Sequence, residues 1–180
     1  MKDGTLLLYH PIPDEPGYEK ILDDVQEKIT QSTFTHVAYY AGGYTWESTI
    51  EKRPGSLLPQ SGVIQTRGLK AAPLYREPTR DLTTAEVDGL VRYGQVQIWI
   101  GRRYNIAELV ADVLIVPTRK FWEWLGWIPF GNNSHGAVCS AFVAKAFVYG
   151  ALIPVFAEIE CADRDPGDFA IHSFWKDSGG

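Results

Sequence analysis

The sequence predicts a single α+β domain over residues 1–180, in which helices pack against an antiparallel sheet. Three observations lead to this prediction. The chain of 180 residues is 45% hydrophobic and 22% charged, which is typical of one domain with its own core. Two β-rich runs flank Gly42-Gly43 and indicate a hairpin. Apolar residues recur at helical spacing in several segments, and no repeat or linker divides the chain.

Strand and helix patterns alternate in the first part of the chain. Residues 4–10 form a short apolar run before Pro11, which predicts a buried strand. Residues 18–30 have the apolar spacing of an amphipathic helix. Residues 34–50 contain the two runs of the hairpin. Residues 51–68 are rich in Pro, Gly, Ser and Gln, which favours a loop or an irregular edge.

The rest of the chain is predicted to contain three helices and three short strands. Thr84 is the expected N-cap of the first helix, Pro117 should end the second, and Gly150 should end the third. The expected helices span residues 83–93, 104–116 and 138–149, and the expected strands span residues 68–74, 153–159 and 169–174.

The hairpin places a histidine and a glutamate on one face of the sheet. If Gly42-Gly43 is a two-residue turn, the residue numbers of each cross-strand pair sum to 85, so Glu47 lies opposite Ala38. Because side chains alternate along a strand, His36 and Glu47 are then diagonal neighbours with Cβ atoms about 7 Å apart. A carboxylate there would fix the tautomer of the imidazole and favour its protonated form. A shift of register by one residue would separate them.

Cys139 is the candidate nucleophile. It opens an apolar helix after the Gly- and Asn-rich stretch at residues 131–136. The unbonded N–H groups and the macrodipole at a helix start favour an anion, so we expect a lowered thiol pKa and a Cys139 N–H available to an oxyanion. A nucleophile also needs a base and a group that orients the base, and His36 and Glu47 are the candidates for these roles.

Short motifs in a characteristic order extend over most of the chain. They are GTLLL at residues 4–8, THVAYY at 35–40, TWES at 45–48, RYN at 103–105, CSAFVAKAF at 139–147 and DPGD at 165–168. In this order they resemble the circularly permuted NlpC/P60 (papain-like) cysteine hydrolases, and most of all the YiiX-type amidases. In the unpermuted families the cysteine helix precedes the histidine strand, whereas here His36 precedes Cys139.

This resemblance implies a circularly permuted papain-like (NlpC/P60) fold, with an antiparallel sheet packed against the cysteine-bearing helix. It implies that Cys139 is the thiolate nucleophile, His36 the general base and acid, and Glu47 the orienting residue. Tyr104 matches the tyrosine that helps to bind the oxyanion together with the Cys139 N–H. The implied reaction is hydrolysis of an amide through a Cys thioester, in a peptidoglycan peptide of the cell wall or a related small amide, with no metal and no organic cofactor.

Two other functions remain open at this point. A lipid-directed acyltransferase or amidase of the lecithin-retinol acyltransferase type shares the permuted order, although its families usually carry a second histidine or another polar group where this chain has Glu47. A non-catalytic structural protein, such as a virion component, would retain the fold without the chemistry. Rapid chemical labelling of Cys139 would favour an enzyme over the structural protein.

The stretch at residues 121–130 is the most unusual part of the sequence. It contains Trp122, Trp124 and Trp127, and its only charged residue is Glu123. These tryptophans could line the substrate groove or contact a membrane or a partner protein, while simple packing against the cysteine helix is the ordinary alternative.

The other histidines and the second cysteine have ordinary structural explanations. His10 and His172 flank apolar runs and have no evident partner. Cys161 lies among acidic residues, whose charges raise the pKa of a thiol. His135 lies four residues before Cys139 and is a rival base or a metal ligand, but this pair lacks an orienting acid.

Charge, cysteine spacing and hydropathy argue against nucleic-acid binding, a disulfide-stabilised fold, secretion and a membrane span. The formal net charge of −5 and the pI near 5.3 argue against nucleic acid. Two cysteines without CxxC spacing do not make a disulfide framework. The first residues lack the apolar region of a signal peptide, and no segment approaches the ~20 apolar residues of a membrane span. We therefore expect a cytoplasmic or virion-associated protein, with its oligomeric state open. The family resemblance implies that it is a bacterial or phage protein.

Overall fold

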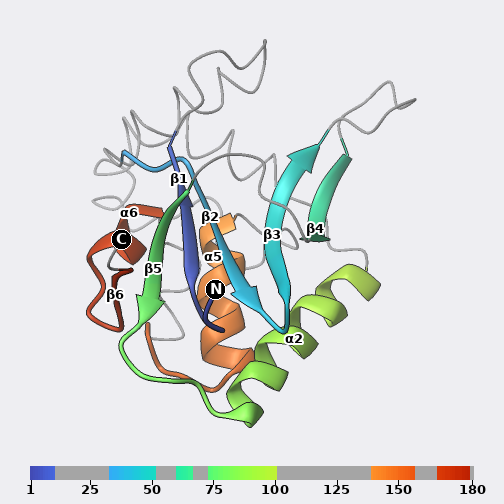
Figure 1. The fold of residues 1–180 in the computed structure, drawn as a ribbon. Coiled ribbons are helices and arrows are strands. Elements are labelled where there is room, and N and C mark those ends of the chain that lie inside the picture. The colour runs from blue at the N-terminus through green and yellow to red at the C-terminus, as the bar shows by residue number, and fades with distance from the viewer. Residues whose placement is uncertain (11–32, 52–59, 67–72, 101–138, 157–165, 179–180) are drawn as a thin grey trace, which may run out of the picture.

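The fold combines one antiparallel sheet with helices, as expected for the α+β class. The computed structural model describes residues 1–10, 33–51, 60–66, 73–100, 139–156 and 166–178 (Figure 1). Within them, six strands form one sheet in the order β4-β3-β2-β1-β5-β6, and every neighbouring pair is antiparallel.

The strands are β1 (Leu6–Tyr9), β2 (His36–Ala41), β3 (Tyr44–Glu51), β4 (Gln60–Thr66), β5 (Leu74–Pro78) and β6 (Trp175–Asp177). The helices are α2 (Thr84–Trp99), α5 (Cys139–Lys145), the π-helix η2 (Ala146–Gly150) that continues α5, and α6 (Pro166–Ile171). No helix in the described part of the chain is long and apolar enough to cross a membrane.

The β2–β3 hairpin has the turn that the sequence predicts. Gly42 and Gly43 have φ values of 61° and 84°, a left-handed conformation that glycine adopts without strain and that a type I′ turn requires. Its register pairs Ala41 with Tyr44, and the pairing continues to Tyr39 and Trp46. The three pairs follow the predicted arithmetic, but they end there: beyond Tyr39 the two strands diverge (Figure 1).

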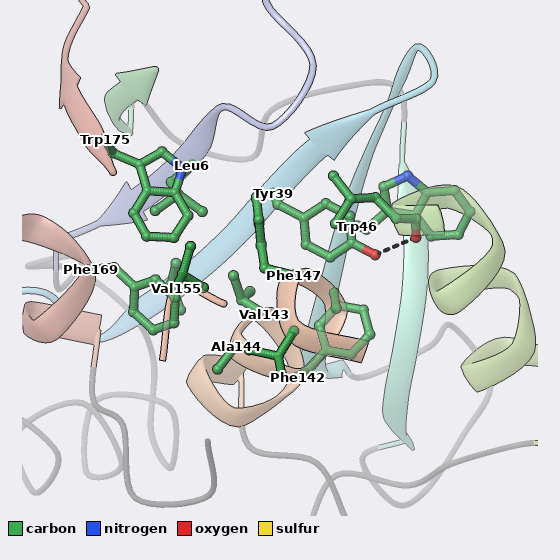
Figure 2. Packing of buried hydrophobic residues seen from close by; sticks show 14 of the residues in the cluster. Leu6, Tyr39, Trp46, Phe142, Val143, Ala144, Phe147, Val155, Phe169 and Trp175 are labelled. Atoms are coloured by element: carbon green, nitrogen blue, oxygen red, sulfur yellow. Dashed lines mark hydrogen bonds between the residues drawn. The ribbon is translucent and has the colours of Figure 1, made fainter. Parts of the chain in front are cut away.

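Helix α5 packs against the face of the sheet that carries the odd-numbered residues of β2. Tyr39 stacks on Phe142 with ring centroids 5.6 Å apart, and Phe147 meets Trp175 edge-on at 5.1 Å. Figure 2 shows these rings with Val143 and Ala144 in one cluster, in which every labelled side chain is buried. Burial of this much apolar and aromatic surface fixes the helix relative to the sheet.

Helix α2 is anchored at its first turn by a capping box. The Thr83 side chain accepts a hydrogen bond from the Glu86 N–H at 3.3 Å, and the Glu86 carboxylate accepts one from the Thr83 N–H at 2.7 Å. Arg80 pairs with the same carboxylate. The expectation that Thr84 is the N-cap was therefore wrong by one residue, and the helix runs past residue 93 to Trp99.

Other sequence predictions about secondary structure need correction. Residues 60–66 form strand β4 where a loop or irregular edge was expected, and residues 169–174 contain the end of α6 and a turn instead of a strand. Residues 151–156 form no strand. Of the strand expected at 68–74, Leu74 is the first residue of β5, and residues 68–72 lie outside the described residues. The predicted helices at residues 18–30 and 104–116 lie outside the described residues.

Candidate active site

The hairpin brings His36 and Glu47 into direct contact. His36 Nε2 lies 3.0 Å from Glu47 Oε2, and the two side chains form an ion pair when the imidazole is protonated. His36 is the first residue of β2, and Glu47 lies on β3 just beyond the last β2–β3 pair. Glu47 is only 5% exposed. The expectation that the Glu47 carboxylate reaches the imidazole is confirmed, whereas the expected pairing of Glu47 with Ala38 does not form.

Cys139 lies beside His36, although about a hundred residues separate them in the sequence. It is the first residue of α5 and is 1% exposed. The thiol is hydrogen-bonded to the His36 side chain and to the backbone N–H groups of Val37 and Ser140. Since Glu47 occupies His36 Nε2, Nδ1 is the ring nitrogen left for the sulfur. The imidazole therefore lies between a thiol and a carboxylate.

The divergence of β2 from β3 explains how a backbone N–H can reach the sulfur. Tyr40 donates its N–H to Thr5 on the β1 side, and backbone groups alternate in direction along a strand, so the Val37 N–H points toward β3. The β2–β3 pairing has already ended at Tyr39. The Val37 N–H is thus available to Cys139, at the point where α5 begins.

Opposing effects set the pKa of each member of the Cys139–His36 pair. Burial is the largest effect on His36 and lowers its pKa, but the charge and hydrogen bond of Cys139, followed by those of Glu47, outweigh it and raise the pKa to about 10. Burial raises the pKa of Cys139, but the charge and hydrogen bond of His36 and the two N–H donors outweigh it, so the thiol pKa is lowered. Each charge stabilises the other, which favours a thiolate–imidazolium pair at neutral pH.

Tyr9 is a residue at this site that the sequence analysis missed. It is the cross-strand partner of His36 on β1, and the two rings lie with centroids 5.5 Å apart. Burial, followed by the negative charge of Glu47 and by Tyr75, raises the pKa of Tyr9, so its phenol stays neutral. Finding it from the sequence would have required the knowledge that β1 pairs with β2 in this register.

The remaining predicted site residues lie outside the described part of the chain. These are Tyr104, Trp122, Trp124 and Trp127, together with His135 and Cys161. The oxyanion role of Tyr104 and the groove formed by the tryptophans therefore stay predictions. Within the described ranges, no group of three or more His, Cys, Asp or Glu side chains is arranged to hold a metal ion.

His172 and His10 are held by backbone groups. His172 Nε2 donates to the Val155 carbonyl at 2.6 Å, and its Nδ1 accepts the Phe174 N–H at 3.1 Å, so both ring nitrogens are used in packing the C-terminal segment. His10 Nδ1 lies 2.9 Å from the Thr33 carbonyl. Neither contact resembles the pairing of His36 with an acid and a thiol.

The arrangement of Cys139, His36 and Glu47 is suited to nucleophilic chemistry. A thiolate can attack an electrophilic carbon, an adjacent imidazolium can protonate a leaving group, and a buried carboxylate can hold the imidazole in place. No family model matches the chain, and no curated protein matches it either.

Proposed function

We propose that this protein is a cysteine hydrolase that cleaves an amide bond through a Cys139 thioester. The observation that supports this proposal is the contact of one imidazole with a thiol on one side and a buried carboxylate on the other. The same proposal includes a circularly permuted papain-like (NlpC/P60) topology, since the histidine strand precedes the cysteine helix and the helix packs on an antiparallel sheet.

The reaction would begin with attack of the Cys139 thiolate on the amide carbonyl carbon. The carbonyl oxygen becomes an oxyanion, for which the Cys139 N–H and Tyr104 are the proposed donors. Protonated His36 then gives its proton to the departing amine as the C–N bond breaks, which leaves a thioester and a neutral imidazole. His36 next takes a proton from water, the hydroxide attacks the thioester, and the C–S bond breaks to restore the thiolate–imidazolium pair. Glu47 holds the imidazole throughout.

The proposed substrate is an amide in a peptidoglycan peptide or a related small amide. This part rests on the order of the motifs, because the residues that would form the groove, Trp122, Trp124 and Trp127, lie outside the described ranges. Digestion of purified cell-wall peptides with this protein, followed by mass spectrometry of the fragments, tests this part of the proposal directly. We expect new fragments with the wild-type protein and none with Cys139→Ser. Cleavage of lipid amides alone would favour the lipid-directed alternative.

Thiol labelling tests the chemistry without a substrate. A small neutral alkylating reagent at neutral pH should modify Cys139 faster than Cys161, which serves as an internal control. His36→Ala should slow the labelling of Cys139 at least about tenfold, because an ordinary thiol is only a few per cent ionised at pH 7. Equal, slow labelling of both cysteines would support a structural protein that retains the fold.

A further inference from the structure

The imidazole of His36 is contacted by side chains from two other strands and from one helix. Glu47 contacts ring nitrogen Nε2, and the Cys139 thiol is hydrogen-bonded to the same side chain, with Nδ1 the ring nitrogen left for the sulfur. Tyr9 lies on the same side of the sheet, as the direct cross-strand partner of His36, and its ring is tilted 43° to the imidazole. An aromatic ring from β1 therefore packs beside the imidazole, in addition to the thiol and the carboxylate.

The hydrogen bonds of the imidazole are not all maintained during the proposed catalysis. In the proposed reaction the proton of His36 leaves and returns, so its hydrogen bond to the sulfur is broken in each cycle. The side chain can rotate about two bonds, and 22% of it is exposed. A ring packed against the imidazole would restrict this rotation and limit the access of water to the His36–Glu47 pair.

We propose that Tyr9 is a positioning residue, whose ring packs against the His36 side chain and holds the imidazole between Cys139 and Glu47. This inference rests on the proposed function for the role of His36 and adds to it a residue that does not touch the reacting atoms. The aromatic ring makes this contact without its hydroxyl group. We therefore expect phenylalanine to substitute for tyrosine at this position without loss of function.

The chemistry of the Tyr9 hydroxyl is consistent with a role for the ring alone. Burial, followed by Glu47 and Tyr75, raises the pKa of the phenol, so no second negative charge competes with the thiolate for His36. The described titratable groups that interact with His36 are Cys139 from α5 and Glu47 from β3. A change in the pH dependence of Cys139 alkylation in a Tyr9 variant would therefore report on the geometry of the Cys139–His36 pair.

The test compares Tyr9→Phe and Tyr9→Ala with the wild type and with Tyr40→Ala. Tyr40 is a matched control, since it is a partly buried tyrosine on the same strand and face as His36, next to the hairpin turn. The readout is the ratio of the rates of Cys139 alkylation at pH 7 and pH 10. At pH 10 every thiol is largely ionised, so the ratio corrects for a change in access to the sulfur.

We expect Tyr9→Phe and Tyr40→Ala to keep the wild-type ratio, and Tyr9→Ala to lower it several-fold, by about tenfold for each unit by which the thiol pKa rises above 7. If circular dichroism shows that Tyr9→Ala is unfolded, Tyr9→Leu replaces it, with the same expected fall. An unchanged ratio in the variant without the ring would overturn the role of Tyr9 and leave the thiolate–imidazolium pair intact. A ratio typical of an ordinary thiol in the wild type would instead remove the proposed function and this inference together.

Discussion

Glu47 is a buried carboxylate. Burial of its charge costs free energy of folding unless a partner compensates for the lost hydration. Its contact with His36 Nε2 at 3.0 Å provides such a partner. The carboxylate also raises the pKa of His36. Because the imidazolium in turn stabilises the thiolate, Glu47 favours the ionised form of Cys139 through His36.

Replacement of this carboxylate tests that indirect effect. Glu47→Gln keeps the size and an oxygen acceptor but removes the charge, so we expect the pKa of His36 to fall and alkylation of Cys139 at pH 7 to slow several-fold, by less than in His36→Ala. Asp88→Asn, which changes a carboxylate on α2, is the control and should leave the rate unchanged. A rate in Glu47→Gln equal to that of the control would contradict the orienting role.

Local geometry explains why His36 and Glu47 could be predicted from the sequence while Tyr9 could not. The first two lie in one hairpin, and the Gly-Gly turn sets the register of the pairs next to it, close enough to His36 and Glu47 for their side chains to meet. Cys139 could be proposed because helix starts favour an anion, but its contact with His36 depends on the packing of α5. Tyr9 depends on a pairing between strands that are far apart in the sequence, for which the sequence has no local signal.

The N-terminus of α2 shows how close local prediction can come and still miss by one residue. Thr83 and Thr84 are both good caps by composition. The position of Glu86 decides between them, because a capping box places the acid three residues after the cap. Glu86 lies three residues after Thr83 but only two after Thr84, so the capping box selects Thr83.

A pair of alanine variants distinguishes the two threonines. Thr83→Ala should lower the free energy of unfolding by about 1 kcal/mol, since it leaves an N–H of the first turn without its side-chain acceptor. Thr84→Ala, at the first helical position, should change it by less than about 0.5 kcal/mol. Urea denaturation measures both. A larger loss at Thr84 than at Thr83 would contradict the observed cap.

Two incorrect secondary-structure predictions have physical reasons. Strand β4 contains Gly62 and several polar residues, so it has little apolar alternation of its own, and its strand form depends on pairing with β3. Helix α6 starts at Pro166, a residue suited to a first helical turn. The apolar residues around Phe169 were interpreted as a strand because a six-residue helix is too short to show a full amphipathic pattern.

The complete site depends on the whole fold. The strand order β4-β3-β2-β1-β5-β6 places the histidine strand at the centre of the sheet, and the aromatic cluster of Tyr39, Phe142 and Phe147 presses α5 onto it (Figure 2). Cys139 is the first residue of that helix, so the packing of its later residues determines where the sulfur lies. Hydrophobic periodicity predicts that such a helix is buried, but it does not say which end meets which strand.

The charge state of His36 provides the most direct test of this account. Nuclear magnetic resonance of ring-labelled histidine, assigned by the signal lost in His36→Ala, follows each imidazole as the pH rises. With Cys139 intact, we expect His36 to stay protonated through neutral pH and to lose its proton near its pKa of about 10. In Cys139→Ser, without the thiolate, its pKa should fall markedly. A wild-type His36 that titrates near the ordinary value of about 6.5 would contradict the thiolate–imidazolium pair.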